Sequence, residues 1–473
     1  MDRRAAWHAL VAWCLDVQAS EGRMPTYAIE TFGCQQNDHD SERAAGLLEA
    51  AGLVPAPSVF EADIALFNTC SVRANADDRF FGHVGRLKSM KQSTGRPIIV
   101  VFGCMMAQPV HRDTLRTTFP YCDVMLGAGA VDLLPEALAD AVTADDRRTV
   151  RDWTDRTSDP FYMGAPPIRD RRHRALVTIM TGCNNFCSYC IVPYTRGREV
   201  SRSYDAILRD VTDAAEAGAV EVMLLGQNVN SYGNDVRRKG RAHPTFAELL
   251  EAVAAVPGID LVRYMTSHPK DLSDELIEVI GRTSTVEPHI HLPLQSGSDR
   301  ILKAMNRRYT ADRYLKLVDR LRAARPGISI TTDLIVGFPG ETDDDFEATL
   351  RVMEAAQFDA AFTFIYSPRV GTPAAEMIDV NDRATIQARF ERLVDLQNRL
   401  SLASNERFVG QTVTCLVDGP SRRDPAVLSA RTRDSRLVNF TVPDDRTPPA
   451  PGDWVDVAIE RVGAFSMEGT ACR

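Results

Sequence analysis

The chain has 473 residues, of which 44% are hydrophobic and 25% charged, a balance typical of soluble globular proteins that excludes disordered and collagen-like chains. At ~100–200 residues per domain it should form two to four domains, and no run reaches the ~18 apolar residues of a transmembrane helix. The chain has 55 basic and 64 acidic residues, which gives a net charge of −9. A polyanionic partner would therefore need a local basic patch.

The N-terminal part of the chain alternates short strands with helices. The pattern predicts strands at 26–32, 62–68, 97–102 and 124–127, and helices at about 41–51 and 131–142. Such alternation is typical of parallel βαβ units, so residues 24–142 predict a parallel-sheet domain. The Asp-, Arg- and Pro-rich residues 143–172 read as a linker. For residues 1–23, which show no secretory signal, two interpretations stay open: a disordered extension outside the fold, or a misassigned start.

A second alternation begins at Ala175. It predicts strands at 175–181, 220–225, 259–265, 287–292, 328–335 and 359–365, and helices at 203–217, 245–256, 272–281, 310–324, 343–356 and 381–404. About six β/α units fall short of a full eight-unit barrel, so residues 173–404 predict a partial (β/α)6 barrel. Residues 405–473 alternate at 409–419, 437–442 and 454–460, which indicates a small all-β barrel. The predicted fold class is therefore α/β, with this all-β barrel appended.

A cysteine-rich loop follows the first strand of this second region. Without a secretory signal we expect a reducing, cytoplasmic setting, where thiols serve metals or redox chemistry more often than disulfides. Cys183, Cys187 and Cys190 in TGCNNFCSYC have C-x3-C-x2-C spacing. Three thiolates this close can ligate three irons of one 4Fe–4S cubane and leave the fourth iron open. The alternative is structural zinc, which takes four protein ligands, and no fourth Cys or His stands nearby.

A second group of cysteines is spread over the N-terminal domain. Each member follows one of its first three predicted strands: Cys34, Cys70 and Cys104. Side chains just past neighbouring parallel strands meet at the carboxyl edge of the sheet, where three thiols could hold a second cluster with one free iron. The alternative is three unrelated buried cysteines. The remaining thiols show no pattern and are interpreted as structural or incidental: Cys14, Cys122, Cys415 and Cys472.

From about Met24 onward the chain resembles the radical S-adenosylmethionine (SAM) methylthiotransferase family. The segments that carry the resemblance are TFGCQQNDHDSE, NTCSVRANADDR, CSYCIVPYTRGREVSR, LLGQNVNSYG, HLPLQSGSDRIL and TTDLIVGFPGET. In this family the open iron of the loop cluster takes the amino and carboxylate groups of SAM, and an electron from that cluster cleaves SAM to a 5′-deoxyadenosyl radical. Another SAM donates a methyl group to sulfur at the second cluster. The resemblance therefore implies two 4Fe–4S clusters and two SAM molecules per turnover.

Within this family the sequence is similar to the tRNA enzymes that attach a methylthio group to C2 of N6-isopentenyladenosine, beside the anticodon. Residues after the first two cysteines favour this branch: Gln35, Asn37, Arg73 and Asn75. Sister enzymes act on N6-threonylcarbamoyladenosine in tRNA or on a ribosomal-protein aspartate, and usually carry Lys-Val-Asn or Pro-Lys-Asn after the first cysteine. One departure is Gln36, where Met is usual. A rival of another class is a non-catalytic iron–sulfur RNA-binding sensor.

The resemblance also implies which residues contact SAM. Tyr189 matches the family's aromatic position near the adenine. Motifs at the strand ends of the partial barrel supply the other expected contacts: Gly226, Gln227, Gln295, Ser296, Gly337, Pro339 and Glu341. Small residues and amides at such ends let the backbone approach a bound cofactor. We assign no general acid or base, because the C2–H bond of adenine is beyond acid–base activation.

Arginines form local basic patches on this acidic chain. Arg196 and Arg198 follow the cysteine loop, and SARTRDSRLVNF, with Arg431, Arg433 and Arg436, resembles the signature of the RNA-binding TRAM domain. Guanidinium groups suit phosphate contacts and base stacking, so we expect these five residues to contact tRNA carrying the isopentenylated adenosine. We further expect an external electron donor, an external sulfur source, no membrane partner and a monomer.

Overall fold

The computed structural model describes residues 2–71, 74–143, 150–155, 161, 164–379 and 381–472. The chain divides into two compact units. The first unit comprises residues 1–170, 181–183 and 191–198, and the second comprises residues 171–180, 184–190 and 199–473. Among the described helices, none combines the length and apolar character needed to cross a bilayer.

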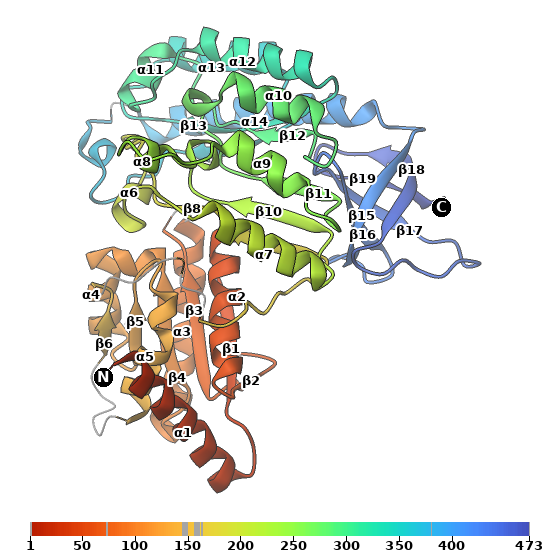
Figure 1. Cartoon of the computed structure of the whole chain (residues 1–473). Helices are drawn as coiled ribbons and strands as arrows, with labels where there is room; N and C mark the ends of the chain where they lie inside the picture. The colour runs from red at the N-terminus through yellow and green to blue at the C-terminus, as the bar shows by residue number, and fades with distance from the viewer. Residues whose placement is uncertain are drawn as a thin grey trace. The chain divides into compact units, whose positions relative to one another are not determined.

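The first unit is built on a parallel sheet with the strand order β2-β1-β3-β4-β5-β6 (Figure 1). Its strands are β1 (Thr26–Thr31), β2 (Val54–Pro55), β3 (Ile64–Thr69), β4 (Ile98–Gly103), β5 (Val124–Leu126) and β6 (Arg151–Trp153). Its helical segments are α1 (Arg3–Glu21), α2 (Gln35–Ala50), α3 (Ala74–Thr94), η1 (Cys104–Ala107), α4 (Pro109–Thr118), η2 (Val131–Leu133), α5 (Leu134–Thr143) and α6 (Val192–Thr195). The residues of β3 are all buried, as expected for a central strand of a covered parallel sheet.

The N-terminal extension is part of this unit, so the prediction of a disordered segment outside the fold is wrong. Asp2 caps the amino end of α1, and Gly22 ends the helix in the left-handed conformation. The buried face of α1 carries Ala6 and Leu10, which join the hydrophobic core. At the first turn, the guanidinium of Arg3 pairs with carboxylates beside and within α5. The extension is therefore a helix packed against the core of this unit.

Two boundaries in this unit differ from the predicted ones. Helix α2 begins at Gln35, six residues before the predicted start at about 41. The prediction missed the first turns because they are polar and lack apolar periodicity. Strand β6 pairs in parallel with β5, so part of the predicted linker belongs to the sheet. Residues 144–149, 156–160 and 162–163 of that linker lie outside the described residues.

The second unit contains the partial barrel. Its six parallel strands are β7 (Arg174–Thr178), β10 (Glu221–Leu225), β11 (Leu261–Tyr264), β12 (His289–His291), β13 (Ser329–Val336) and β14 (Ala360–Ile365). They form two sheets, β11-β10-β7 and β12-β13-β14, joined by a bridge between Val262 and Val286. All six predicted strands are present, which confirms the partial (β/α)6 barrel.

Helices follow these strands as the sequence predicts (Figure 1). The longer ones are α7 (Tyr204–Glu216), α9 (Phe246–Ala254), α10 (Asp274–Arg282), α12 (Ala311–Ala324), α13 (Asp343–Ala356) and α14 (Arg383–Glu406). Shorter elements are β8 (Met180–Thr181), β9 (Val200–Ser201), η3 (Val229–Ser231), α8 (Asn234–Arg237), η4 (Pro269–Asp271), α11 (Asp299–Ala304) and η5 (Pro373–Glu376). The apolar faces of the longer helices pack with the strands into one hydrophobic core.

The C-terminal segment closes into a small barrel with the strand order β15-β16-β17-β19-β18. The strands are β15 (Thr412–Pro420), β16 (Leu428–Thr432), β17 (Leu437–Thr441), β18 (Trp454–Val462) and β19 (Met467–Ala471). The small all-β barrel is therefore confirmed. Arg263 of β11 links the small barrel to the partial barrel, and its side chain is 1% exposed. The guanidinium of Arg263 pairs with Glu221 and Glu287 and donates to the carbonyls of Thr432 and Arg433.

Candidate functional site

Three thiols lie at the carboxyl edge of the sheet in the first unit. Cys70 and Cys104 directly follow β3 and β4, and Cys34 lies three residues after the end of β1; the three strands are neighbours in the sheet. Cys34 is exposed, whereas Cys70 and Cys104 are buried. Burial raises the pKa of Cys104 to about 11, an effect that the charge of Arg196 opposes and the charges of Cys34 and Cys70 increase. The three thiols thus share one edge of the sheet.

An amide network joins the segments that carry these thiols. The Nδ2 of Asn37 donates to Oδ1 of Asn68 at 2.7 Å and to the carbonyl of Thr69 at 3.0 Å. The Nδ2 of Asn68 donates back to the carbonyl of Asn37 at 2.8 Å. Gly103 is required beside them, because a Cβ there would lie 2.5 Å from the Thr69 carbonyl oxygen. Sequence reasoning used Asn37 only as a branch marker and missed Asn68, although Asn68 stands two residues before a cysteine.

Arg196 belongs to this thiol site, which corrects the prediction that it contacts RNA. Its side chain is only 5% exposed. One guanidinium nitrogen, Nη2, lies 3.0 Å from Oδ2 of Asp40, and Nε donates to Sγ of Cys104 at 3.2 Å. A guanidinium committed to a buried carboxylate and a thiol is not available to a phosphate. Arg198, two residues later, is exposed.

The cysteine loop spans the division of the chain into units. Cys183 belongs to the first unit, where its N–H donates to the carbonyl of Gly197. Cys187 and Cys190 belong to the second unit, where the N–H of Cys190 donates to the carbonyl of Cys187 at 2.9 Å. Nη1 of Arg307 lies 3.6 Å from Sγ of Cys187. This part of the loop is therefore compact, with a guanidinium against one thiol.

The donor chemistry of both thiol groups fits iron–sulfur clusters. Soft thiolates select iron–sulfur clusters, zinc or copper(I), and each thiolate of a cubane binds a different iron. Over the residues that the structure describes, no three Cys, His, Asp or Glu side chains converge as ligands of a single metal ion. Guanidinium groups against Cys104 and Cys187 would offset the negative charge that thiolate ligands bring.

The residues predicted to contact SAM are mostly buried at the strand ends. Tyr189 packs against the small apolar cluster of Ile301, Met305, Phe338 and Ala374, and burial raises the pKa of its phenol. Gln295, four residues after the end of β12, adopts a left-handed φ of 72°. Other residues of this set are buried: Ser296, Gly337 and Pro339. Gly226 and Gln227 are half-buried.

Two of these predicted contacts have clear structural roles. A Cβ at Gly226 would lie 2.6 Å from Cγ of Met180, so only glycine fits after β10. The carboxylate of Glu341 accepts the N–H of Gly337 at 2.8 Å and lies 3.4 Å from Nη1 of Arg389. Burial outweighs the arginine and raises the pKa of Glu341 to about 7. Glu341 therefore holds the turn after β13.

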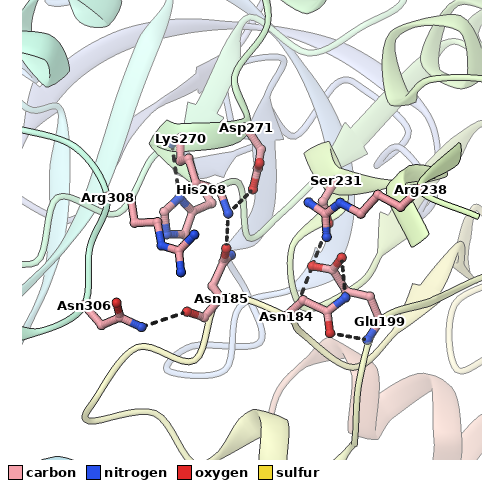
Figure 2. A pocket seen from close by; sticks show the side chains of 10 residues that line it. All are labelled: Asn184, Asn185, Glu199, Ser231, Arg238, His268, Lys270, Asp271, Asn306 and Arg308. Atoms are coloured by element: carbon pink, nitrogen blue, oxygen red, sulfur yellow. Dashed lines mark hydrogen bonds and ion pairs between the residues drawn. The ribbon is translucent and has the colours of Figure 1, made fainter. Parts of the chain in front are cut away.

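A polar pocket of ≈ 170 Å³ lies beside the cysteine loop in the second unit. Figure 2 shows its lining residues: Asn184, Asn185, Glu199, Ser231, Arg238, His268, Lys270, Asp271, Asn306 and Arg308. Glu199 accepts hydrogen bonds from Nδ2 of Asn184 at 3.2 Å and from Oγ of Ser231 at 3.0 Å. Asp271 lies 3.6 Å from Nζ of Lys270. The pocket thus presents both carboxylates and cations to whatever enters it.

Sequence reasoning missed every residue of this pocket. Asn184 and Asn185 stand between the first two cysteines of the loop, and Glu199 lies in the GREVSR segment that carries the family resemblance. Their positions in these segments were the available signal. The convergence of His268, Lys270 and Asp271 from the segment after β11 could not be read from spacing.

The arginines of the C-terminal barrel divide into two kinds. Arg436 is 8% exposed, pairs with Asp359 at 2.5 Å and lies over the ring of Phe408 at 5.0 Å, which does not fit the predicted RNA contact. Arg431 is 40% exposed and lies 3.4 Å from Asp418. Arg433 stacks over Trp454 at 4.6 Å and is partly exposed. Arg431 and Arg433 thus keep accessible side-chain surface, although Nη1 of Arg431 donates to the carbonyl of Ser435 and Nη1 of Arg433 to that of Asp260.

Comparison with known proteins covers nearly the whole chain. Residues 26–127 match Uncharacterized protein family UPF0004, residues 177–353 match the Radical SAM superfamily, and residues 406–472 match the TRAM domain. The chain is 43% identical over 456 residues to the tRNA-2-methylthio-N(6)-dimethylallyladenosine synthase of Acetivibrio thermocellus, covering 96% of this chain and 93% of that protein. It is 46% identical over 444 residues to the protein of the same name from Moorella thermoacetica, covering 94% and 98%.

Solved structures share the fold at low sequence identity. The radical S-adenosylmethionine methyltransferase TsrM from Kitasatospora setae matches with a TM-score of 0.50 and 15% identity over 74% of each chain. The cobalamin-dependent S-adenosylmethionine radical enzyme OxsB matches with a TM-score of 0.52 and 13% identity, over 79% of this chain and 61% of that one. At these identities the likeness concerns the fold alone.

Proposed function

The chain belongs to the family of tRNA-2-methylthio-N6-dimethylallyladenosine synthases, and we propose that it methylthiolates C2 of N6-dimethylallyladenosine beside the anticodon of tRNA. It is a radical SAM enzyme with a C-terminal TRAM domain. The observation that carries the proposal is the pair of thiol groups: one after three neighbouring strands of the first unit, and one on the C-x3-C-x2-C loop.

We propose that each thiol group holds one 4Fe–4S cluster. Cys34, Cys70 and Cys104 would hold one, and Cys183, Cys187 and Cys190 the other. When bound, the clusters supply the electron that cleaves SAM and a site for the sulfur to be transferred, with two SAM molecules used per turnover. The chain itself excludes water around Cys70, Cys104, Cys183 and Cys187, which are all buried.

The polar pocket beside the loop is our proposed site for the amino-acid part of SAM. Its carboxylates, Glu199 and Asp271, suit an ammonium group, and its cations, Lys270 and Arg308, suit a carboxylate. Asn184 and Ser231 orient Glu199 by donating to it. Glu199→Gln should therefore weaken SAM binding in equilibrium dialysis. Glu251→Gln, which removes a half-exposed carboxylate on the outer helix α9, should leave SAM binding unchanged.

For tRNA we propose contacts from Arg198, Arg431 and Arg433, whose side chains keep accessible surface. Each lost phosphate contact should flatten the log–log salt dependence of binding by ~0.7–0.9. Arg431→Ala with Arg433→Ala should raise the dissociation constant for tRNA and leave SAM cleavage without tRNA unchanged. We also propose that the enzyme acts as a cytoplasmic monomer with an external reductant and an external sulfur source.

Substrate discrimination tests the proposed activity directly. The five-carbon tail of the substrate buries several methylenes at ~0.8 kcal/mol each, so its absence should cost ~2–4 kcal/mol, or roughly 30- to 1000-fold. Threonylcarbamoyladenosine should react more slowly still, because its carboxylate would be stranded in an apolar site. A competition assay with the three tRNAs, read by mass spectrometry of 2-methylthio products, measures this order. Equal or faster reaction of the threonylcarbamoyl tRNA would contradict the proposal.

A further inference from the structure

Arg196 is a buried cation that faces a thiol of the first unit. Its side chain is 5% exposed, and that of its partner Asp40 is 4% exposed. Removing two charges from water costs several kcal/mol per ion unless each is paired and hydrogen-bonded, so a buried arginine keeps a defined partner. The Nη2–Asp40 contact of 3.0 Å therefore fixes the guanidinium plane.

The fixed plane directs a second donor at sulfur. Nε of Arg196 donates to Sγ of Cys104 at 3.2 Å, within the range for a hydrogen bond to sulfur. Arg196 follows α6, and it belongs to the same unit as Asp40 and Cys104. The contact thus joins residues from three separate segments of one compact unit.

We propose that Arg196 is a positioning residue that raises the reduction potential of the cluster held by Cys34, Cys70 and Cys104. Hydrogen bonds to the sulfurs and nearby net charge set cluster potentials, because a reduced cluster carries one more negative charge and a cation stabilises it. Asp40 serves by orienting the guanidinium toward Cys104. This inference rests on the proposed function, since it presupposes a cluster at these three thiols.

The test measures a potential in the full-length chain. In a background of Cys183→Ala, Cys187→Ala and Cys190→Ala, iron reports the remaining cluster alone, and a redox titration followed by electron paramagnetic resonance gives its potential. Arg196→Gln removes the charge and should lower the ratio of reduced to oxidised cluster about tenfold at fixed potential, which is ~59 mV for one electron. Arg196→Lys keeps the charge but loses the planar fork, so it should give a smaller shift in the same direction.

Lys91→Gln is the matched control. Lys91 is also a buried cation of this unit, 9% exposed and 2.8 Å from Asp123, but Asp123 stands at the amino end of β5, opposite to the thiols. This variant should leave the potential unchanged. An unmoved potential in Arg196→Gln would overturn the inference. So would loss of iron from both Arg196 variants while Lys91→Gln keeps it, since that result makes Arg196 a residue that only holds the cluster in place. Absence of iron from the background protein itself would contradict the proposed cluster site.

Discussion

The two thiol groups of this chain are built in opposite ways. Cys34, Cys70 and Cys104 follow three strands separated along the chain, and buried amides and an arginine hold their segments together. Cys183, Cys187 and Cys190 come from one loop of eight residues. The first group therefore depends on the tertiary fold of a whole sheet, whereas the second is close to a local property of the sequence. The two groups should respond differently to the same kind of damage.

The largest expected difference comes from removing each group. Replacing Cys183, Cys187 and Cys190 by alanine should leave about half of the iron and abolish 5′-deoxyadenosine formation, because the cubane that cleaves SAM has lost its ligands. Replacing Cys34, Cys70 and Cys104 should also remove about half of the iron but keep SAM cleavage and lose methylthio transfer. Iron analysis and chromatography of both products measure this. Full iron and full methylthio transfer in the second variant would show that the first unit holds no cluster.

Each unit contains a buried carboxyl group that should make its stability depend on pH. Burial raises the pKa of Glu42 in the first unit and of Glu341 in the second to about 7, from a usual value of 4.5. The folded state holds these protons more tightly than the unfolded state does. The protonated carboxyl groups therefore contribute to the free energy of unfolding fully below pH 4.5, and this contribution is lost as the pH rises to about 7. At ~1.4 kcal/mol per unit, Glu42→Gln and Glu341→Gln should each stabilise their unit by about 3 kcal/mol at pH 8.

Denaturant unfolding at pH 5 and pH 8 measures this dependence. At pH 5 the variants and the parent chain should differ by much less, because the carboxyl groups are then largely protonated in the folded state. Glu251→Gln, on an exposed helix face, should show no such pH dependence. If the two variants gained the same free energy of unfolding at pH 5 as at pH 8, these two carboxyl groups would already be ionised in the folded chain at pH 5.

A smaller difference is expected from the amide network. Asn68→Ala leaves the side-chain amide of Asn37 without one of its partners, at a cost of about 1–3 kcal/mol, and loosens the segments that carry the first thiol group. Iron should be lost from that group while 5′-deoxyadenosine formation persists. Asn439→Ala, in the small barrel, is a matched control that should keep all iron. Equal loss of SAM cleavage would contradict the independence of the two groups.

The smallest effect is expected at the loop. The side chain of Asn306 donates to the carbonyl of Phe186 at 2.8 Å. The backbone of Asn306 has a left-handed φ of 56°, which glycine tolerates. Asn306→Gly should therefore cost only about 0.5–1.5 kcal/mol, and slow 5′-deoxyadenosine formation by less than about tenfold. Rate measurement under anaerobic conditions checks this. A complete loss of SAM cleavage would show that the loop depends on tertiary contacts as much as the first thiol group does.

Short-range patterns in the sequence were enough to predict the architecture. The six strands of the partial barrel, the parallel sheet before it and the small barrel after it follow from local apolar periodicity within each predicted strand. The spacing of Cys183, Cys187 and Cys190 is equally local. Strand order then placed the other three thiols at one edge, because residues after neighbouring parallel strands must share that edge.

Only the tertiary structure decided which charged side chains stay accessible. Arg196 and Arg436 stand in basic segments, but Asp40, which pairs with Arg196, is 156 residues away in the chain. Arg436 pairs with Asp434, two residues before it, and also with Asp359, 77 residues away. A sequence shows how many charges lie in a segment, and not which opposite charges the fold brings to them. The same limit hid the polar pocket, whose lining comes from several loops. Hydrophobic periodicity is a local property, whereas the pairing of a buried charge depends on residues that meet only when the chain is folded.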